Sequence, residues 1–272
     1  AGHYIGDFAF LNANHFQPMR QLLKITATFT LALVFSAGMA FGQDADITQR
    51  SNQNDATVEQ SNEEDVADVS QNGISNKATA LQGGGSYIEQ IQGGNNNKAL
   101  GSHSGNTYLT QEQRGNRNEA YAWATSNATV TQEQFGSENF AQVGQSGGKY
   151  GPTAINQKSD VSQIQRGDLN VAKIDIRQGN GRNNFFEQTQ NGINNKAKIL
   201  DVGNENTVTQ IQVGNNNVST VGAFGDPQLG GAEVFTEQRG HRNTATVGGE
   251  LGSYDATIEQ FGNDNTATVT QN

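Results

Sequence analysis

The chain has 272 residues, including 33 glycines, three prolines and no cysteine, and its formal net charge is −10. Only 33% of the residues are hydrophobic, which is too few for an ordinary globular core of this length and lies closer to the composition of low-complexity chains. The absence of cysteine excludes disulfides and thiolate zinc sites. The acidic charge argues against nucleic acid as a partner, because phosphate binding needs clustered lysine and arginine.

Residues 1–42 differ in composition from the rest of the chain. Arg20 and Lys24 precede a mostly apolar run over residues 25–40, which is too short to span a bilayer comfortably. Residues 19–42 are therefore predicted to be a secretory signal peptide that is cleaved after one of the small residues at its end. Residues 1–18 show no repeat pattern and are interpreted as an upstream segment outside the mature protein. The remaining chain is expected to work outside the cytoplasm.

Residues 43–68 are strongly acidic. They contain eight carboxylates against Arg50 alone, which gives 1 − 8 = −7 of the formal net charge of −10. We interpret this segment as an acidic, degenerate first coil of the repeat described next, kept soluble by self-repulsion.

A short motif, Q-x-G-x-x-N-x-A, recurs through residues 69–272. Nine good copies recur at a period of about 22 residues, and the gap between Gln134 and Gln165 is wider than the others. The glutamines and asparagines of these copies are Gln71, Asn76, Gln92, Asn97, Gln113, Asn118, Gln134, Asn139, Gln165, Asn170, Gln190, Asn195, Gln212, Asn217, Gln238, Asn243, Gln260 and Asn265. The glycines are Gly73, Gly94, Gly115, Gly136, Gly167, Gly192, Gly214, Gly240 and Gly262. Weaker copies fall at Gln49, Gln60, Gln82, Gln178 and Asp201, and we interpret them as half-period repeats.

Residues around each motif alternate with period two. In the copy at Gln113, one parity collects Leu109, Gln111, Asn118 and Ala120, whereas the other parity varies freely between copies. This alternation is typical of β-strands with a uniform inner face, and no helical spacing fits it. The sequence therefore predicts an all-β solenoid of roughly ten coils, each a strand, a turn and a strand.

Stacked coils explain why amides stand where a core residue is expected. A buried amide is costly when it has no partner, but like residues lie over like residues when coils stack about 4.8 Å apart. Each glutamine or asparagine can then donate to one neighbouring copy and accept from the other. We expect the motif glycine to supply a positive φ in the turn, with the asparagine tolerating such a conformation or bonding the local backbone.

Two segments interrupt the repeat, and they are predicted to be loops: residues 144–158 and residues 222–233. Both are rich in glycine, and each holds one proline. The final copy reaches Gln271 with no capping element after it, so we expect its last strand to be an open edge. Head-to-tail stacking on such an edge does not close and generates a filament with cross-β geometry.

The repeated motif, together with the predicted secretion signal, closely resembles the curlin repeat of curli subunits. The resemblance covers about residues 43–272. It implies a secreted structural subunit that self-assembles into extracellular, pilus-like amyloid fibres of a bacterial biofilm matrix, where they serve adhesion and surface colonisation. The implied partners are other copies of the chain, a minor nucleator curlin, an outer-membrane secretion channel and accessory chaperones.

The resemblance also bears on details of this chain. It implies that the glutamines and asparagines of the motif are the ladder residues. Thr236 and Ile258 depart from the pattern, since a glutamine is expected two residues before the motif glutamine. The complete last repeat favours a major over a minor subunit. The family also has an export segment at its mature N-terminus, which is a second interpretation of residues 43–68.

Other functions find weaker support. His103 and His241 are interpreted as surface turn residues without a paired ligand, and neither a metal nor a cofactor is predicted. Charges are scattered, so we predict no catalytic site and no enzyme. The alternative is a solenoid that binds a surface without polymerising, as an adhesin or an ice-binding protein. For ice binding, the expected array of threonines is Thr110, Thr131, Thr209 and Thr268, and it is interrupted by Glu89, Ser162, Glu187 and Glu259.

Overall fold

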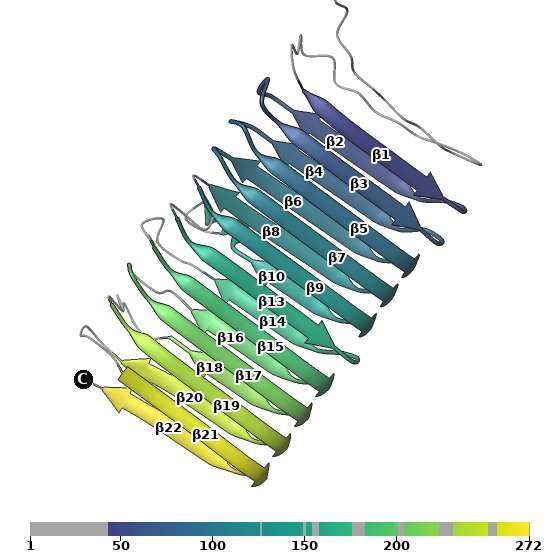
Figure 1. Cartoon of the computed structure of the whole chain (residues 1–272). Coiled ribbons are helices and arrows are strands. Elements are labelled where there is room, and N and C mark those ends of the chain that lie inside the picture. Colours follow the sequence, from purple (N-terminus) through teal and green to yellow (C-terminus); the bar gives the residue numbers. More distant parts are fainter. Residues whose placement is uncertain are drawn as a thin grey trace, which may run out of the picture.

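The computed structural model describes residues 43–125, 127–148, 151–153, 158–175, 183–200, 204–222, 231–249 and 255–271. The predicted upstream segment and signal peptide lie outside these residues. The described chain is entirely β-structure and loop, and it winds into a flat solenoid (Figure 1).

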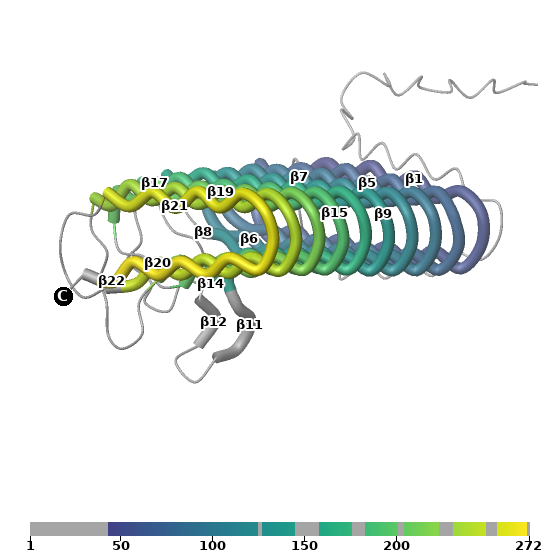
Figure 2. The backbone as a smooth tube through the Cα atoms, turned by 90° about the horizontal axis from the view of Figure 1, so that it is seen from below, coloured from purple at the N-terminus to yellow at the C-terminus, as the bar shows by residue number. Residues whose placement is uncertain are grey.

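Each coil contributes one strand to each of two parallel sheets, and each sheet has ten strands among the described residues. The first sheet consists of β1 (Asp44–Arg50), β3 (Val66–Asn72), β5 (Tyr87–Asn95), β7 (Tyr108–Asn116), β9 (Thr129–Ser137), β13 (Asp160–Arg166), β15 (Phe185–Ile193), β17 (Thr207–Asn215), β19 (Glu233–His241) and β21 (Asp255–Asn263). The second sheet consists of β2 (Asp55–Gln60), β4 (Lys77–Gln82), β6 (Lys98–Ser104), β8 (Glu119–Thr125), β10 (Phe140–Val143), β14 (Val171–Asp175), β16 (Lys196–Leu200), β18 (Val218–Val221), β20 (Thr244–Gly249) and β22 (Thr266–Gln271). Seen along the stacking axis, the coils superpose as a series of narrow loops (Figure 2).

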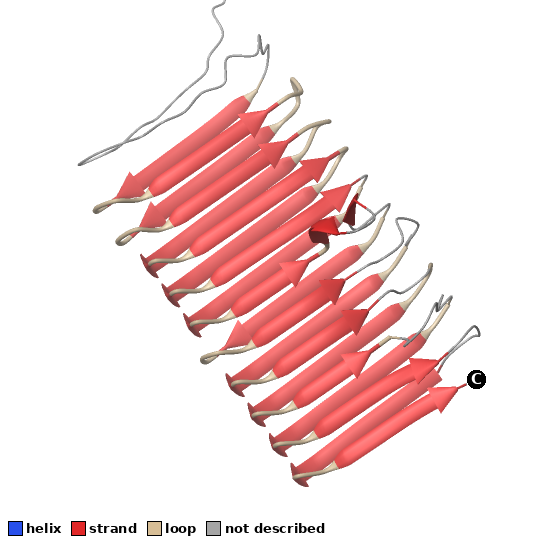
Figure 3. Ribbon diagram, turned by 180° about the vertical axis from the view of Figure 1, so that it is seen from behind, coloured by secondary structure: helices blue, strands red, loops and turns tan. Residues whose placement is uncertain are grey.

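The predicted β-solenoid of about 22-residue coils is confirmed. Strands alternate buried and partly exposed residues because only one face of each sheet meets the other sheet. In β7, for example, Leu109, Gln111 and Gln113 point inward, whereas Thr110 and Glu112 point outward. The strands of each sheet lie side by side in one continuous stack (Figure 3).

The register places each motif over the next one. Gln71 pairs with Gln92, and the same pairing of motif glutamines continues through every later coil. Gln49 pairs with Gln71 in the same way, so its interpretation as a half-period copy is wrong: it is the motif glutamine of a complete first coil. Gln60 and Gln82 pair with each other in the second sheet. Gln178 and Asp201 lie outside the described residues.

The acidic residues 44–60 form the strands of that first coil, β1 and β2, in register with the second coil. The turn loses the motif glycine here, because Ser51 stands at the position of Gly73 and has a φ of 75°. A degenerate sequence therefore still adopts the solenoid backbone.

The interruptions are narrower than the sequence predicted. The first contains a small antiparallel hairpin, β11 (Gln145–Gly148) and β12 (Gly151–Thr153), and the amide of Lys158 already bonds the preceding coil at Asn127. In the second, Gly231 donates to Asn204, and Glu233 opens β19. The predicted loop at 222–233 therefore includes residues that belong to the regular coil, since Gly231 and Glu233 already bond or pair with the preceding coil.

Candidate functional site

The motif glutamines form one continuous amide ladder inside the solenoid. Each Nε2 donates to the Oε1 of the glutamine in the next coil, at 2.7–2.9 Å, from Gln49 through to Gln260. Each glutamine from Gln71 onward also donates at 3.0 Å to a backbone carbonyl of the preceding strand in the second sheet; Gln92, for example, bonds Lys77 O. Both amide hydrogens are thus satisfied without water, and the two sheets are joined at every coil.

The motif asparagines form a second ladder with the opposite polarity. The Oδ1 of Asn76 accepts the backbone N–H of Asn97 at 3.0 Å and its Nδ2 at 3.2 Å, and the same backbone bond joins every coil from Asn54 to Asn265. The Nδ2 of Asn97 donates forward to the carbonyl of Gly115 at 2.8 Å. All motif asparagines except Asn265 are buried. These bonds satisfy the turn carbonyls, so the asparagine closes the turn of the neighbouring coil.

The turn glycines are required for close packing as well as for backbone conformation. A Cβ on Gly94, which has a φ of 99°, would fall far inside van der Waals contact with the carbonyl oxygen of Gly115. The other positive φ in this turn lies at the residue before the motif asparagine, such as Asn96 at 57°, and not at the asparagine itself. Of the two roles expected for the motif asparagine, a positive φ is therefore wrong, whereas a bond to the local backbone is confirmed: Nδ2 of Asn97 donates to the carbonyl of Gly93 at 3.1 Å.

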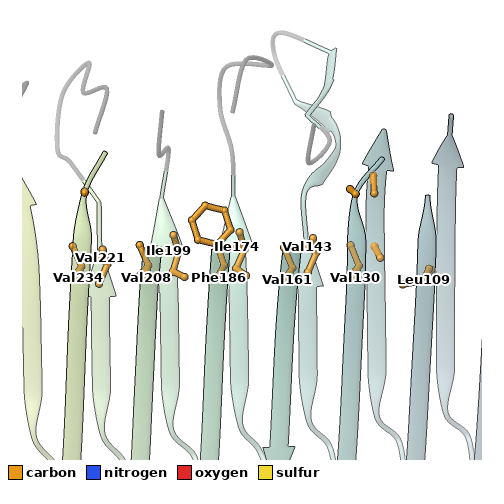
Figure 4. Close-up of a cluster of buried hydrophobic side chains, with 14 of the residues drawn as sticks. Leu109, Val130, Val143, Val161, Ile174, Phe186, Ile199, Val208, Val221 and Val234 are labelled. Atoms are coloured by element: carbon orange, nitrogen blue, oxygen red, sulfur yellow. The ribbon is translucent and has the colours of Figure 1, made fainter. Parts of the chain in front are cut away.

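A shorter glutamine ladder occupies the middle of the stack. Gln90, Gln111, Gln132, Gln163, Gln188 and Gln210 bond in sequence at 2.7–2.8 Å. Aliphatic and aromatic side chains line the core beside it, with Val161 and Phe186 from the first sheet beside Val143 and Ile174 from the second (Figure 4). At both ends the glutamine is replaced, by Ile47 and Val69 and by Thr236 and Ile258.

Where this inner ladder ends, two departures from the motif compensate for each other. Gln210 faces Thr236, which has no side-chain amide, and instead donates at 2.9 Å to the hydroxyl of Ser219. Ser219 stands where most coils have alanine, and its hydroxyl lies 2.8 Å from Thr236 Oγ1. The sequence showed both departures separately; only the fold brings them into contact.

His103 is not a surface turn residue. It points inward from β6, is only 6% exposed, and neither ring nitrogen has a hydrogen-bond partner. Burial lowers its pKa to about 3, because the charged imidazolium would lose its hydration. The prediction failed because β6 extends to Ser104, so His103 lies within the strand and keeps the inward parity of Ala99 and Gly101. His241 does lie exposed at the end of β19, as predicted.

Asp65, which the sequence grouped with the solvated acids, is fully buried. Its carboxylate accepts backbone N–H bonds from Ser61, Asn62, Gly85 and Ser86 at 2.9–3.2 Å. It therefore joins the turns of two successive coils. The sequence position of Asp65 could have indicated this role. It lies just before a strand, and the next two coils have the buried polar residues Ser86 and Thr107 at the same position.

The outward faces carry no uniform threonine array among the described residues. Thr110 and Thr131 are paired in the first sheet, but Glu89, Ser162 and Glu187 continue the same row. Thr268 lies on the second sheet and is not part of that row. In the same part of the chain, no group of three acidic or histidine side chains has the arrangement of a metal site, and no helix has the length and apolarity of a membrane span.

The terminal coils expose the unpaired members of the ladders. The Nε2 of Gln260 bonds Thr244 O but has no further glutamine acceptor, and no described group donates to Oδ1 of Asn265. In the first coil, the described bonds leave Gln49 Oε1 without a donor and the backbone N–H of Asn54 without an acceptor. Ala267 and Val269 are only partly buried, whereas Ala245 and Val247 of the preceding coil are buried.

Comparison with known families identifies the repeat. The curlin associated repeat matches residues 233–272, which hold β19 to β22. A search of curated proteins found no match. The predicted curlin repeat is therefore confirmed within residues 233–272, and the register shows the same motif glutamine in all ten described coils.

Proposed function

We propose that this curli-related structural protein is a secreted subunit that polymerises head to tail into extracellular amyloid fibres of a biofilm matrix. The chain acts in this proposal as a building element and not as an enzyme. The curlin repeat and the β-solenoid fold support it, since both belong to structural proteins.

The observation that carries the proposal is the matched polarity of the two solenoid ends. The last described coil offers an amide donor at Gln260 and an acceptor at Asn265, and the first coil offers an acceptor at Gln49 and a donor at Asn54. A second copy in the same orientation satisfies all four groups, whereas a reversed copy opposes donor to donor. Same-direction stacking does not close on itself, so it produces a filament.

Export and partners are proposed from the curlin resemblance together with the predicted signal at residues 19–42. The mature chain passes an outer-membrane channel, is held unfolded by accessory chaperones, and starts growth on a minor nucleator curlin, with this chain as the major subunit. The acidic residues 43–68 assist export in this proposal. Replacing their exposed carboxylates by Asn or Gln, while keeping Asp65 for its turn, should lower secretion; unchanged secretion would remove that role.

The test is refolding of residues 43–272, which contain the whole described solenoid, from denaturant. Thioflavin fluorescence should rise after a lag that preformed fibres abolish. Fibre diffraction should give one reflection at about 4.7 Å and a second at about 10 Å. A soluble β-rich monomer that stays monomeric at high concentration would contradict the proposal. That result would favour the non-polymerising surface binder.

A further inference from the structure

The two broad faces of the flat solenoid carry different charges. The described strands of the first sheet contain twelve carboxylates, four arginines and no lysine, which gives 4 − 12 = −8. Those of the second sheet contain four carboxylates, five lysines and no arginine, which gives 5 − 4 = +1. These side chains all point outward, because uncharged residues take the inward parity. One face is therefore acidic, and the opposite face carries every lysine of the described strands (Figure 2).

The acidic face contains a row of like charges, which we name the acidic row. It consists of Asp46, Asp68 and Glu89, which are in register on β1, β3 and β5 and thus about 4.8 Å apart. Among the described residues, no salt bridge reaches any of the three, and Oδ1 of Asp46 is buried without a hydrogen bond. Burial, followed by the charges of Asp46 and Asp44, raises the pKa of Asp68 above its usual value. In-register like charges are destabilising, so a cationic partner would stabilise this row.

The second sheet contains the opposite arrangement, which we name the lysine row. Lys173 and Lys198 are in register on β14 and β16, and Lys196 points outward from the same strand as Lys198. In the described part of the chain, none of the three lysines has a carboxylate partner. The Nζ of Lys173 lies 4.9 Å from the ring centroid of Phe140, a contact that holds the ammonium group along the face.

The two rows lie back to back at the same place along the strands. Gln90 follows Glu89, and its Nε2 crosses the core to the carbonyl of Thr79 at 3.0 Å. Thr79 belongs to the same row of the second sheet as Lys173 and Lys198, as the register through β6, β8 and β10 shows. A second filament in the same orientation, displaced perpendicular to the sheets, therefore brings an acidic row to the height of a lysine row. Only a slide of four coils along the axis, roughly 19 Å, is needed to bring the charges opposite each other.

We propose that neighbouring filaments associate side by side in one orientation, with the lysine row of one filament against the acidic row of the next. This rests on the proposed function, because it needs filaments, and it adds their lateral contact. After the slide of four coils, Lys173 lies opposite Asp68 and Lys198 lies opposite Glu89. Each contact relieves like-charge repulsion in both rows. The outer filaments keep a free row of each sign, so the association does not close and further filaments can add.

The size of the faces fits a second filament as the partner. Ten coils at about 4.8 Å and strands of six residues make a face of roughly 43 Å by 20 Å, or about 800 Å² per copy. Stable protein interfaces bury about this area on each partner. A single exposed ion pair contributes only about 0–1 kcal/mol, but every subunit of a filament repeats the contact, so the weak pairs add along its length.

The first experiment compares fibres grown from residues 43–272 by their sedimentation and by their width in electron micrographs at about 10 mM salt. Lys173→Gln with Lys198→Gln should lower the sedimented fraction by about threefold or more. The matched control is Arg117→Gln with Arg242→Gln, which removes the same charge from exposed turns and from neither face. The control should sediment like the parent. Raising the salt to about 1 M should disperse the parent bundles, because the Debye length falls from about 30 Å to about 3 Å.

A charge exchange then tests which faces meet. Fibres with Lys173→Glu and Lys198→Glu, and separately grown fibres with Asp46→Lys and Asp68→Lys, should each stay dispersed, since the two faces of each then carry the same sign at the contact. A mixture of the two should bundle. The substitutions change the formal net charge of the full chain from −10 to −14 or to −6, so both fibres stay acidic and overall attraction between them does not explain bundling.

The outcomes separate the lateral contact from fibre formation. Equal bundling in the parent, the lysine variant and the arginine control, or a mixture that stays dispersed, would overturn the contact and leave the proposed function intact. Parent fibres that stay apart at low salt but bind heparin through Lys173 and Lys198 would also overturn it, and would make the lysine row a site for an anionic polymer. A parent chain that forms no fibre would contradict the proposed function, and the lateral contact with it.

Discussion

The side-chain amide of Gln210 donates to the hydroxyl of Ser219 in the facing sheet, in place of the glutamine that continues the ladder elsewhere. With threonine at position 236, the Gln210 amide has no ladder acceptor there. The Ser219 hydroxyl takes the place of that acceptor. In the two preceding coils, Gln163 and Gln188 donate to the next glutamine instead, so this relation belongs to one coil junction and not to the repeat in general.

Removing the Ser219 hydroxyl should destabilise the solenoid. Ser219→Ala leaves one hydrogen of the buried Gln210 amide without an acceptor, which costs about 1–3 kcal/mol. Adding Thr236→Gln should restore the ladder bond of Gln210 and recover part of this loss, because the new amide itself faces Ile258 and gains no ladder acceptor. A double-mutant cycle on the urea midpoint of freshly refolded chain would measure the recovery. Additive effects of the two substitutions would show that they do not compensate.

Two adjacent glycines should respond differently to alanine. Gly94→Ala drives a Cβ into the Gly115 carbonyl and strains a φ of 99°, so we expect a loss of about 4 kcal/mol or more, or no folding. Gly93→Ala is the matched control, because a Cβ there meets nothing closer than 3.9 Å. It should stay within about 0.5 kcal/mol of the parent. Circular dichroism during urea unfolding compares them; equal losses would mean that close approach is not what the turn requires.

Fibre growth should depend on the ladder groups of the last coil. Gln260→Ala and Asn265→Ala each remove a group that the proposed function pairs with an incoming copy, so seeded elongation should slow several-fold. Glu259→Ala is the control, since its side chain points outward from the same strand. The elongation rates of the three variants are compared by thioflavin fluorescence at equal seed concentration. Identical rates in all three would contradict pairing through the ladders.

His103 should make the fold sensitive to mild acid. Its pKa is about 3 when folded and about 6.5 when unfolded, so the unfolded chain binds a proton first as the pH falls. Titration of His103 does not change the free energy of unfolding above about pH 6.5. Below that pH the folded state is destabilised progressively, down to about pH 3. By pH 4.5 the loss is about 2–3 kcal/mol.

The control for this pH effect is His103→Gln, which removes the titrating ring and places an amide beside Gln82, one residue beyond the paired Leu81 and Ser102. Urea midpoints at pH 7.5 and 4.5 should differ more in the parent than in the variant. A parent and a variant with the same pH dependence would show that His103 is hydrated or charged in the folded chain.

The repeat by itself determined the period, the inward parity of the first strand of each coil, and the identity of the ladder residues. These follow from the sequence because a solenoid stacks like on like, so a residue's neighbours in space are the same position one period away. Gln71 and Asn76 could be paired with Gln92 and Asn97 on spacing alone. The same logic identified Thr236 and Ile258 as departures, though not what replaced the missing glutamines.

Only the tertiary structure decided the contacts that cross from one sheet to the other or join the irregular turns. Ser219 contacts Gln210 and Thr236 because the strands of the two sheets face each other. The number of residues in the connecting turn determines which side chains of the two strands come into contact. The burial of His103 and the four backbone bonds of Asp65 arise in the same way, at strand ends where turns vary in length. The place of Gln49 in a complete coil also became clear only from its pairing with Gln71, because Ser51 stands in place of the turn glycine that marks the other copies.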